Sequence, residues 1–172
     1  MLRPLSVLIA LLFACACAQD ARAHTVVIIV RHAEKAAAPA DDPPLSEAGR
    51  ARAEKLADIG VGAGVEAVFT SQATRARDTA APLAARLGLT PQVRAVTGQT
   101  VDAHVKSVAK EILDSHEGKT VLVVGHSNTA PRIAAILSKQ NIPDLVDATE
   151  FDALFVVIIP KKGAPRLIRS KY

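Results

Sequence analysis

Cysteine and aromatic residues are scarce in this chain of 172 residues. Its two cysteines, Cys15 and Cys17, both lie near the N-terminus, so residues 24–172 can form neither a disulfide nor a thiolate zinc site. Tryptophan is absent, and one tyrosine and four phenylalanines leave few rings to stack on nucleotide bases. The net charge is +4, and removal of residues 1–23, which hold two arginines and one aspartate, leaves a mildly basic chain of charge +3. We therefore expect no nucleic-acid partner.

Residues 1–23 have the composition of a secretory signal peptide. Arg3 precedes an apolar stretch from Leu5 to Ala18, and small residues follow as far as Ala23. This stretch is shorter than the roughly 20 residues of a membrane-spanning helix, so we expect no stable membrane span. Cleavage after Ala23 or Ala18 would export one domain, residues 24–172, to the periplasm.

A second interpretation of the same leader is a lipid anchor. The segment Leu12-Phe13-Ala14-Cys15 loosely resembles a bacterial lipoprotein cleavage box, in which Cys15 would carry the lipid. Phe13 fits that box poorly. Soluble export is therefore favoured, and lipidation at Cys15 is the alternative.

Strand patterns and helix patterns alternate along residues 24–172. The expected strands cover residues 26–30, 65–70, 92–96, 121–125, 153–159 and 166–168. One expected helix is capped by Ser46 and ends at Gly60, and the next covers residues 73–87 with a kink or restart at Pro82. A third contains residues 101–112, and a fourth is capped by Ser127 or Asn128. This order predicts a three-layer α/β/α sandwich with a mostly parallel central sheet and right-handed crossovers.

Basic residues follow three of these strands. Arg31 and His32 come directly after residues 26–30, and His126 follows residues 121–125. Arg75 opens the helix after the strand at residues 65–70. Ligands of parallel α/β sheets bind beyond the carboxyl ends of the strands, so we expect these side chains to share one crevice. Arg77 is expected on the surface.

Four sequence blocks carry a resemblance to a known family. They are Arg31-His32-Ala33-Glu34-Lys35, Pro44-Leu45-Ser46-Glu47-Ala48-Gly49, the segment from Ser71 to Thr79, and Val124-Gly125-His126-Ser127-Asn128-Thr129. In order and separation they resemble the histidine phosphatase superfamily, also called the phosphoglycerate-mutase-like family. The resemblance implies a phosphoglycerate-mutase-like fold, with His32 as the catalytic nucleophile. It also implies that Arg31, Arg75 and His126 bind the substrate phosphate.

The chemistry of these side chains suits the implied roles. A neutral imidazole nitrogen can attack phosphorus without losing a proton, and the phosphohistidine that forms is then hydrolysed by water. Arginine binds two phosphoryl oxygens with one planar group and stays charged. Amide groups after His126, at a helix start, would add anion stabilisation. We expect a backbone carbonyl or a carboxylate to fix the His32 tautomer, and we expect neither metal nor cofactor.

The proton donor to the leaving group is less defined by the sequence. Many members of the family use an acidic residue between the Arg75 and His126 blocks, and Asp102 is our candidate. An acidic residue favoured by the helix dipole is an equally good interpretation of Asp102. Glu34 and Asp42 are alternatives. A phosphoramidate or another good leaving group would need no carboxylic acid.

Other functions fit the sequence less well. A serine hydrolase would use Ser127, but Thr129 stands where the nucleophile elbow wants glycine and no histidine follows. A metal hydrolase built on His32 and His126 lacks a nearby third ligand. A noncatalytic phosphate-binding module would not need the nucleophile. A phosphomutase would need insertions that the short stretch between the last two blocks does not supply.

We therefore expect a metal-independent phosphohydrolase with a small phosphorylated substrate. An exported enzyme could act on an envelope sugar phosphate, including a lipopolysaccharide heptose, or on small phosphate esters, and the sequence does not separate the two. A protein phosphohistidine fits export less well. His104 and His116 are expected on the surface of their helix, and Lys35 either meets a substrate anion or is simply exposed.

Overall fold

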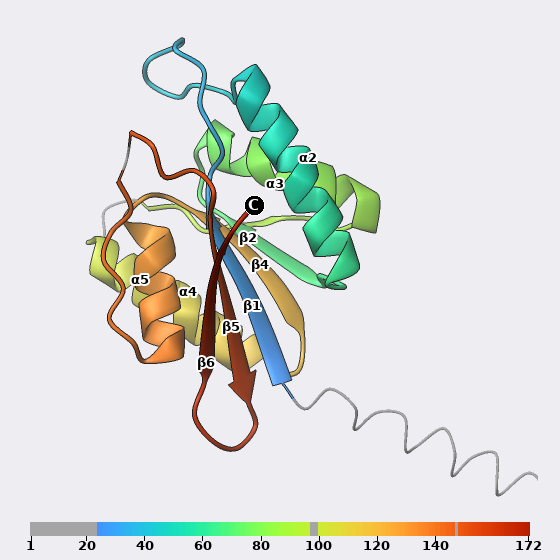
Figure 1. Ribbon diagram of the computed structural model, residues 1–172, viewed down its shortest axis with the longest axis vertical. Coiled ribbons are helices and arrows are strands. Elements are labelled where there is room, and N and C mark those ends of the chain that lie inside the picture. The colour runs from blue at the N-terminus through green and yellow to red at the C-terminus, as the bar shows by residue number, and fades with distance from the viewer. Residues whose placement is uncertain (1–23, 97–99, 147) are drawn as a thin grey trace, which may run out of the picture.

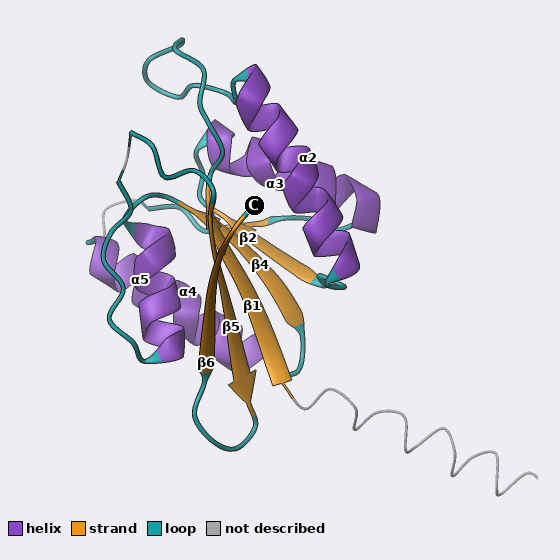
Figure 2. Ribbon diagram, viewed as in Figure 1, coloured by secondary structure: helices purple, strands orange, loops and turns teal. Residues whose placement is uncertain are grey.

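The computed structural model describes residues 24–96, 100–146 and 148–172. They form a mixed six-stranded sheet with α2 and α3 on one face and α4 and α5 on the other (Figures 1 and 2). The predicted α/β/α sandwich is confirmed. The predicted leader at residues 1–23, including Cys15, lies outside the described residues.

The strands and helices follow the predicted order. The strands are β1 (His24–Arg31), β2 (Ala67–Thr70), β3 (Gln92–Val93), β4 (Thr120–Gly125), β5 (Ala153–Pro160) and β6 (Arg166–Lys171). The helices are α2 (Glu47–Gly62), α3 (Thr74–Leu87), α4 (Val101–Ser115) and α5 (Thr129–Ser138). None of the helices among these residues is long and apolar enough to cross a membrane.

The sheet has the order β3-β2-β4-β1-β5-β6. β3, β2, β4 and β1 are parallel neighbours, whereas β5 is antiparallel to both β1 and β6. β1 and β4 are therefore adjacent and point the same way, and Arg31 pairs in register with Gly125. This pairing brings the residues that follow both strands to one edge of the sheet.

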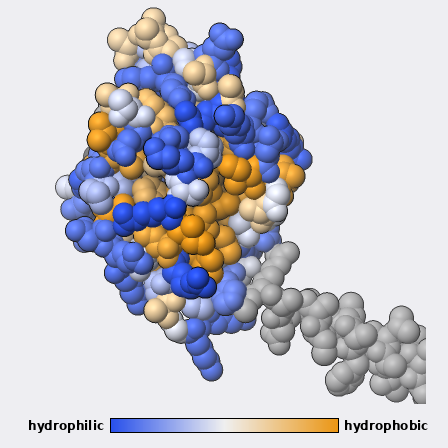
Figure 3. Space-filling model, in the orientation of Figure 1, coloured by the Kyte–Doolittle hydropathy of each residue, from blue (hydrophilic) through white to orange (hydrophobic). Residues whose placement is uncertain are grey.

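Alternate residues of the central strands pack against opposite helix pairs. Val27 and Ile29 of β1 join the cluster beneath α4 and α5, and Ile28 and Val30 join the cluster beneath α2 and α3. The central strands therefore bury both faces, as a parallel sheet between helices requires. At the edge, β6 is mostly exposed and carries Ile168, whose side chain is 46% exposed. Hydrophobic side chains also gather in one area of the face in Figure 3.

The helix ends agree only partly with the prediction. Ser46 caps α2 by accepting a hydrogen bond from the Gly49 amide, as expected. α3 continues through Pro82 to the left-handed Gly88, so no restart occurs there. Asn128 occupies the N-cap position of α5 but makes no side-chain capping bond.

The surface placement of His104 and His116 was wrong. Both side chains are only 8% exposed. They lie four residues before Val108 and four residues after Ile112, so the helical period puts them in line with the apolar residues of α4. Phe69 packs edge-on against the His116 ring, with the ring centroids 5.3 Å apart.

Gly49 allows α2 to pack closely on the segment that follows β1. A Cβ atom at this position would lie 2.1 Å from the backbone oxygen of Glu34, whereas a Cβ at Gly62 would have no neighbour within 4 Å. Both glycines are in α2, so replacement by alanine gives each the same gain in helix propensity. Of these two glycines, only Gly49 carries a packing constraint.

We expect Gly49→Ala to lower the free energy of unfolding by about 1–3 kcal/mol, the usual cost of overpacking. Gly62→Ala is the matched control and should leave stability unchanged or slightly raised. Urea unfolding of the two variants measures the difference. Equal stabilities for both variants would show that the close approach to Glu34 is not a constraint.

Candidate active site

The residues after β1, β2 and β4 line one cavity of about 250 Å³. Its lining consists of Arg31, His32, Lys35, Arg75, His126, Ser127 and Asn128. The structure thus brings together the four side chains that the sequence placed in one crevice. They come from β1 and its following residue, from the first turn of α3, and from the segment between β4 and α5.

Two hydrogen bonds define the orientation of the His32 ring. Nδ1 lies 2.8 Å from the carbonyl oxygen of Ala33, and Nε2 lies 3.2 Å from the Arg75 Nε that donates to it. Because a carbonyl only accepts, Nδ1 carries the proton and Nε2 keeps its lone pair. The backbone of His32 is also fixed, since its amide donates to the Gly125 carbonyl at 2.9 Å. The expected tautomer-fixing partner is the Ala33 carbonyl.

The environment keeps this imidazole neutral. Burial lowers the pKa of His32 to about 3, with the hydrogen bond to the Ala33 carbonyl acting in the opposite direction. Electrostatic interactions with His126, Arg31 and Arg75 lower the pKa further. At neutral pH the ring therefore presents an unprotonated Nε2 to the cavity.

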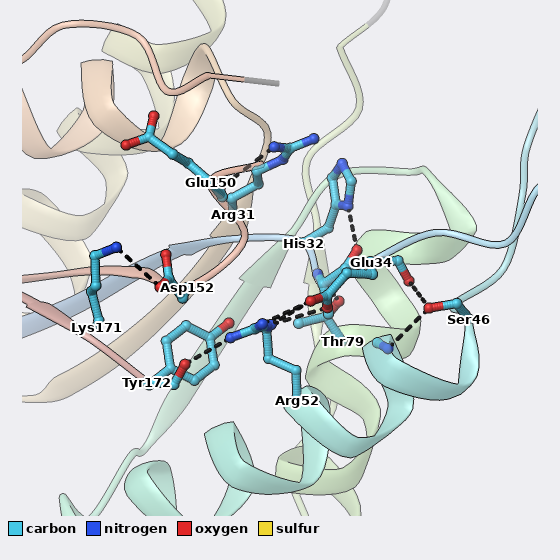
Figure 4. A network of polar contacts seen from close by, with 12 residues as sticks. Arg31, His32, Glu34, Ser46, Arg52, Thr79, Glu150, Asp152, Lys171 and Tyr172 are labelled. Carbon is cyan, nitrogen blue, oxygen red and sulfur yellow. Dashed lines mark hydrogen bonds and ion pairs between the residues drawn. The ribbon is translucent and has the colours of Figure 1, made fainter. Parts of the chain in front are cut away.

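Arg31 is almost completely buried, at 1% exposure. Its guanidinium carbon lies 3.9 Å from the centre of the Phe151 ring, a stacked cation–π arrangement. One terminal nitrogen donates to the carbonyl oxygens of Val146 and Glu150, at 3.5 and 3.4 Å. Figure 4 shows Arg31 beside Glu150 and close to His32. These contacts fix a positive charge next to the imidazole.

His126 faces His32 across the cavity, with ring centroids 5.3 Å apart and an edge-on geometry. Its Nε2 lies 2.8 Å from the Ser71 hydroxyl. Its backbone amide donates to the Thr129 hydroxyl at 2.8 Å, which fixes the segment between β4 and α5. Both histidines thus have defined ring positions.

Three residues around the site, Thr79, Ser71 and Phe151, have roles that were not predicted from the sequence. The fully buried Thr79 hydroxyl accepts from the Ala33 amide at 2.9 Å and donates to the Arg75 carbonyl at 2.7 Å. It therefore couples the His32 segment to α3 (Figure 4). A hydroxyl four residues after Arg75 can bond back to that carbonyl, so this signal was available. For Phe151, a loop residue, the sequence carries no comparable signal.

The candidate proton donors are bound elsewhere. Arg52 holds both Glu34 oxygens, with its Nε at 3.1 and 3.0 Å, and thereby lowers the pKa of Glu34 (Figure 4). Asp102 has a side chain that is 70% exposed, pairs with Arg132 at 3.1 Å, and does not line the cavity. The structure therefore does not bring Asp102 together with the four cavity residues.

Asp42 lies nearer to the cavity, at 3.8 Å from an Arg75 terminal nitrogen. Hydrogen bonds from Thr74 lower the pKa of its carboxyl, so this group is ionised at neutral pH. Neither Glu34 nor Asp42 is therefore in the protonated state that a general acid requires.

The competing site types find little support in the geometry. Among the described residues, no group of three or more histidine, cysteine, aspartate or glutamate side chains is placed to hold a metal ion. An activated serine would need a hydrogen bond to a histidine, and within the described residues the Ser127 hydroxyl makes none.

The comparisons with known proteins agree with this arrangement. The family model described as the histidine phosphatase superfamily (branch 1) matches residues 27–96, which include Arg31, His32 and Arg75. None of the curated proteins matches the chain in sequence.

Several solved structures share the fold. The protein histidine phosphatase SixA, complexed with tungstate, is 23% identical, with a TM-score of 0.65 over 85% of this chain and 96% of that chain. The mycobacterial glucosyl-3-phosphoglycerate phosphatase is 17% identical, with a TM-score of 0.59 over 87% and 97%. A structure named mycobacterial hydrolase 1 is 16% identical, with a TM-score of 0.63 over 84% and 97%. The chain is therefore similar to the histidine phosphatase superfamily in sequence over residues 27–96, and it shares its fold with solved phosphatases.

Proposed function

We propose that the protein is a metal-independent phosphohydrolase that removes phosphate from a small substrate through a phosphohistidine at His32. One observation carries the proposal: the unprotonated Nε2 of a buried, neutral imidazole faces a guanidinium inside a cationic cavity. The nucleophile and the groups that bind its target are therefore adjacent.

In the first step, His32 Nε2 attacks phosphorus, an N–P bond forms and the bond to the leaving oxygen or nitrogen breaks. Arg75 donates to Nε2 in the absence of substrate, so its guanidinium must turn toward the phosphoryl oxygens before attack. Arg31 and Arg75 then neutralise charge that spreads over those oxygens in the transition state. In the second step, water displaces His32 from phosphorus and inorganic phosphate leaves.

The ionisation and pairing of the candidate acidic residues limit which leaving groups the site can release. Glu34 and Asp42 both have lowered pKa values, and Asp102 is paired outside the cavity. A leaving group that needs no proton from an enzyme carboxyl suits such a site, for example a phosphoramidate nitrogen that takes its proton from solvent, or an acidic alcohol. The protein histidine phosphatase and glucosyl-3-phosphoglycerate phosphatase among the structural neighbours make phosphoramidates and sugar-linked phosphates the first classes to assay.

The location of the enzyme is a separate part of the proposal. The composition of residues 1–23 supports export to the periplasm, with lipidation at Cys15 as the alternative. An exported enzyme would meet envelope sugar phosphates, including lipopolysaccharide heptose phosphates, or small phosphate esters.

We expect His32→Ala to lower the release of inorganic phosphate from an aryl phosphate by roughly a thousandfold or more, because the covalent step is lost. The wild type should keep its activity in excess chelator. His24→Ala, at the exposed histidine that begins β1, is the control. Transfer of phosphate to an acceptor without release would instead indicate a mutase. Phosphate binding without turnover would indicate a binding module.

We expect Arg75→Lys to weaken the binding of vanadate or phosphate roughly 10- to 100-fold, although the charge is kept, because lysine cannot present the planar fork. Arg77→Lys is the matched control, since Arg77 is exposed, belongs to the same helix and does not line the cavity. Titration calorimetry gives both affinities. Equal affinity for Arg75→Lys and wild type would assign anion binding to charge alone.

The lowered pKa of His32 gives a pH prediction. Between pH 4 and 8, the ring nitrogen shifts of His32 should stay those of a neutral imidazole with the proton on Nδ1, since its pKa is about 3. In urea-unfolded protein the same ring should titrate near the ordinary value of about 6.5. Nitrogen NMR of histidine-labelled protein measures both states. A His32 inflection near pH 6.5 in the folded protein would contradict the buried neutral ring.

A further inference from the structure

Asp42 connects an exposed loop to the start of α3. The loop leaves the cavity after Lys35 and returns through an isolated antiparallel bridge between Lys35 and Leu45. Within it, Asp42 Oδ1 accepts from the Thr74 amide at 2.9 Å, and Oδ2 accepts from the Thr74 hydroxyl at 2.6 Å. Two hydrogen bonds therefore join positions that are 32 residues apart in the chain.

This contact replaces a local helix cap. The N-cap residue of α3 is Ala73, whose methyl group cannot accept a hydrogen bond. The first amides of a helix have no partner within the helix, and a side-chain oxygen normally satisfies one of them. Asp42 does this from outside the helix, and its negative charge also suits the positive end of the helix dipole. The capped turn is the one that carries Arg75.

Arg75 is held from two sides. Its Nε donates to His32 Nε2 at 3.2 Å, and a terminal nitrogen lies 3.8 Å from Asp42 Oδ1. Asp42 is half exposed and its carboxyl is ionised, because the hydrogen bonds from Thr74 lower its pKa. A negative charge therefore lies beside the guanidinium that must bind the phosphoryl group.

We propose that Asp42 is a positioning residue that fixes the first turn of α3, and with it Arg75, and that its carboxylate competes with the substrate phosphoryl group for the guanidinium. The identity of the competing anion rests on the proposed function, whereas the cap does not. Substrate binding must then draw Arg75 away from both His32 and Asp42.

Two substitutions separate the cap from the charge. Asn is as good a cap as Asp but is neutral, so Asp42→Asn removes the charge and the acceptor of the Thr74 hydroxyl while it keeps an oxygen for the Thr74 amide, and Asp42→Ala removes all three. We expect Asp42→Asn to bind inorganic phosphate about two- to fivefold more tightly than wild type, the scale of an exposed ion pair. We expect Asp42→Ala to bind phosphate about fivefold more weakly than Asp42→Asn, because the first turn of α3 loses its cap.

Amide hydrogen exchange and the salt dependence of phosphate affinity distinguish the proposed roles of Asp42 from a general loss of stability. The Thr74 amide should stay protected in wild type and Asp42→Asn and should exchange faster in Asp42→Ala. At 1 M salt, where the Debye length is about 3 Å, the affinity gain of Asp42→Asn should shrink. Asp41→Asn is the matched control, because Asp41 lies in the same exposed loop without a hydrogen bond or ion pair to the described residues.

The proposal is overturned if Asp42→Asn does not tighten phosphate binding, if Asp41→Asn tightens it equally, or if Thr74 protection is the same in Asp42→Ala and wild type. These assays do not depend on turnover. Phosphate binding without hydrolysis of any ester would contradict the proposed function. The phosphate affinities of the Asp42 and Asp41 variants could still be compared. If the protein does not bind phosphate at all, the proposed competition between Asp42 and phosphate for Arg75 is refuted. Hydrogen exchange at the Thr74 amide would still test whether Asp42 caps α3.

Discussion

The hydrogen bond from His32 Nδ1 to the Ala33 carbonyl is the interaction on which the site depends. It joins a side chain to the backbone of the next residue, at 2.8 Å, so the orientation of the ring is set by the conformation of one short segment. With the proton held on Nδ1, the lone pair at Nε2 points toward the cavity and Arg75. A free imidazole would exchange between its two tautomers, and only one of them could attack phosphorus here.

Because this bond belongs to the backbone, the surroundings of residues 32–34 matter as much as the ring. The Ala33 amide is bound by the Thr79 hydroxyl, and the Glu34 carbonyl accepts from the Ser46 amide. The Glu34 carboxylate is held by Arg52, which also donates to the Tyr172 carbonyl oxygen at 2.7 Å (Figure 4). The segment is thus connected to α3, to α2 and to the residue after β6. Gly49 allows the close contact between α2 and the Glu34 backbone, because a Cβ atom at this position would lie 2.1 Å from the Glu34 carbonyl oxygen.

The order of strands and helices and the convergence of Arg31, His32, Arg75 and His126 followed from local patterns and from one topological rule for parallel strands. What the sequence could not supply were partners that depend on packing between distant segments. Phe151 beneath Arg31 and Asp42 at the start of α3 are examples, since neither lies next to its partner in the chain. The surface placement of His104 and His116 failed for another reason. Their spacing from Val108 and Ile112 puts them on the buried face of α4, and their polar character does not override this position.

Burial of these histidines sets how the fold responds to acid. The pKa values of His32, His104 and His116 are all lowered, and burial is the largest cause for each. The unfolded chain binds protons at these rings below about pH 6.5, whereas the folded chain does not, so stability falls as the pH drops from that value toward the folded pKa values. The carboxyls of Glu34 and Asp42, whose pKa values are also lowered, act in the same direction at lower pH. His32 itself stays unprotonated to about pH 3. Acid therefore begins to weaken the scaffold that orients the imidazole at a higher pH than the one at which it protonates the nucleophile.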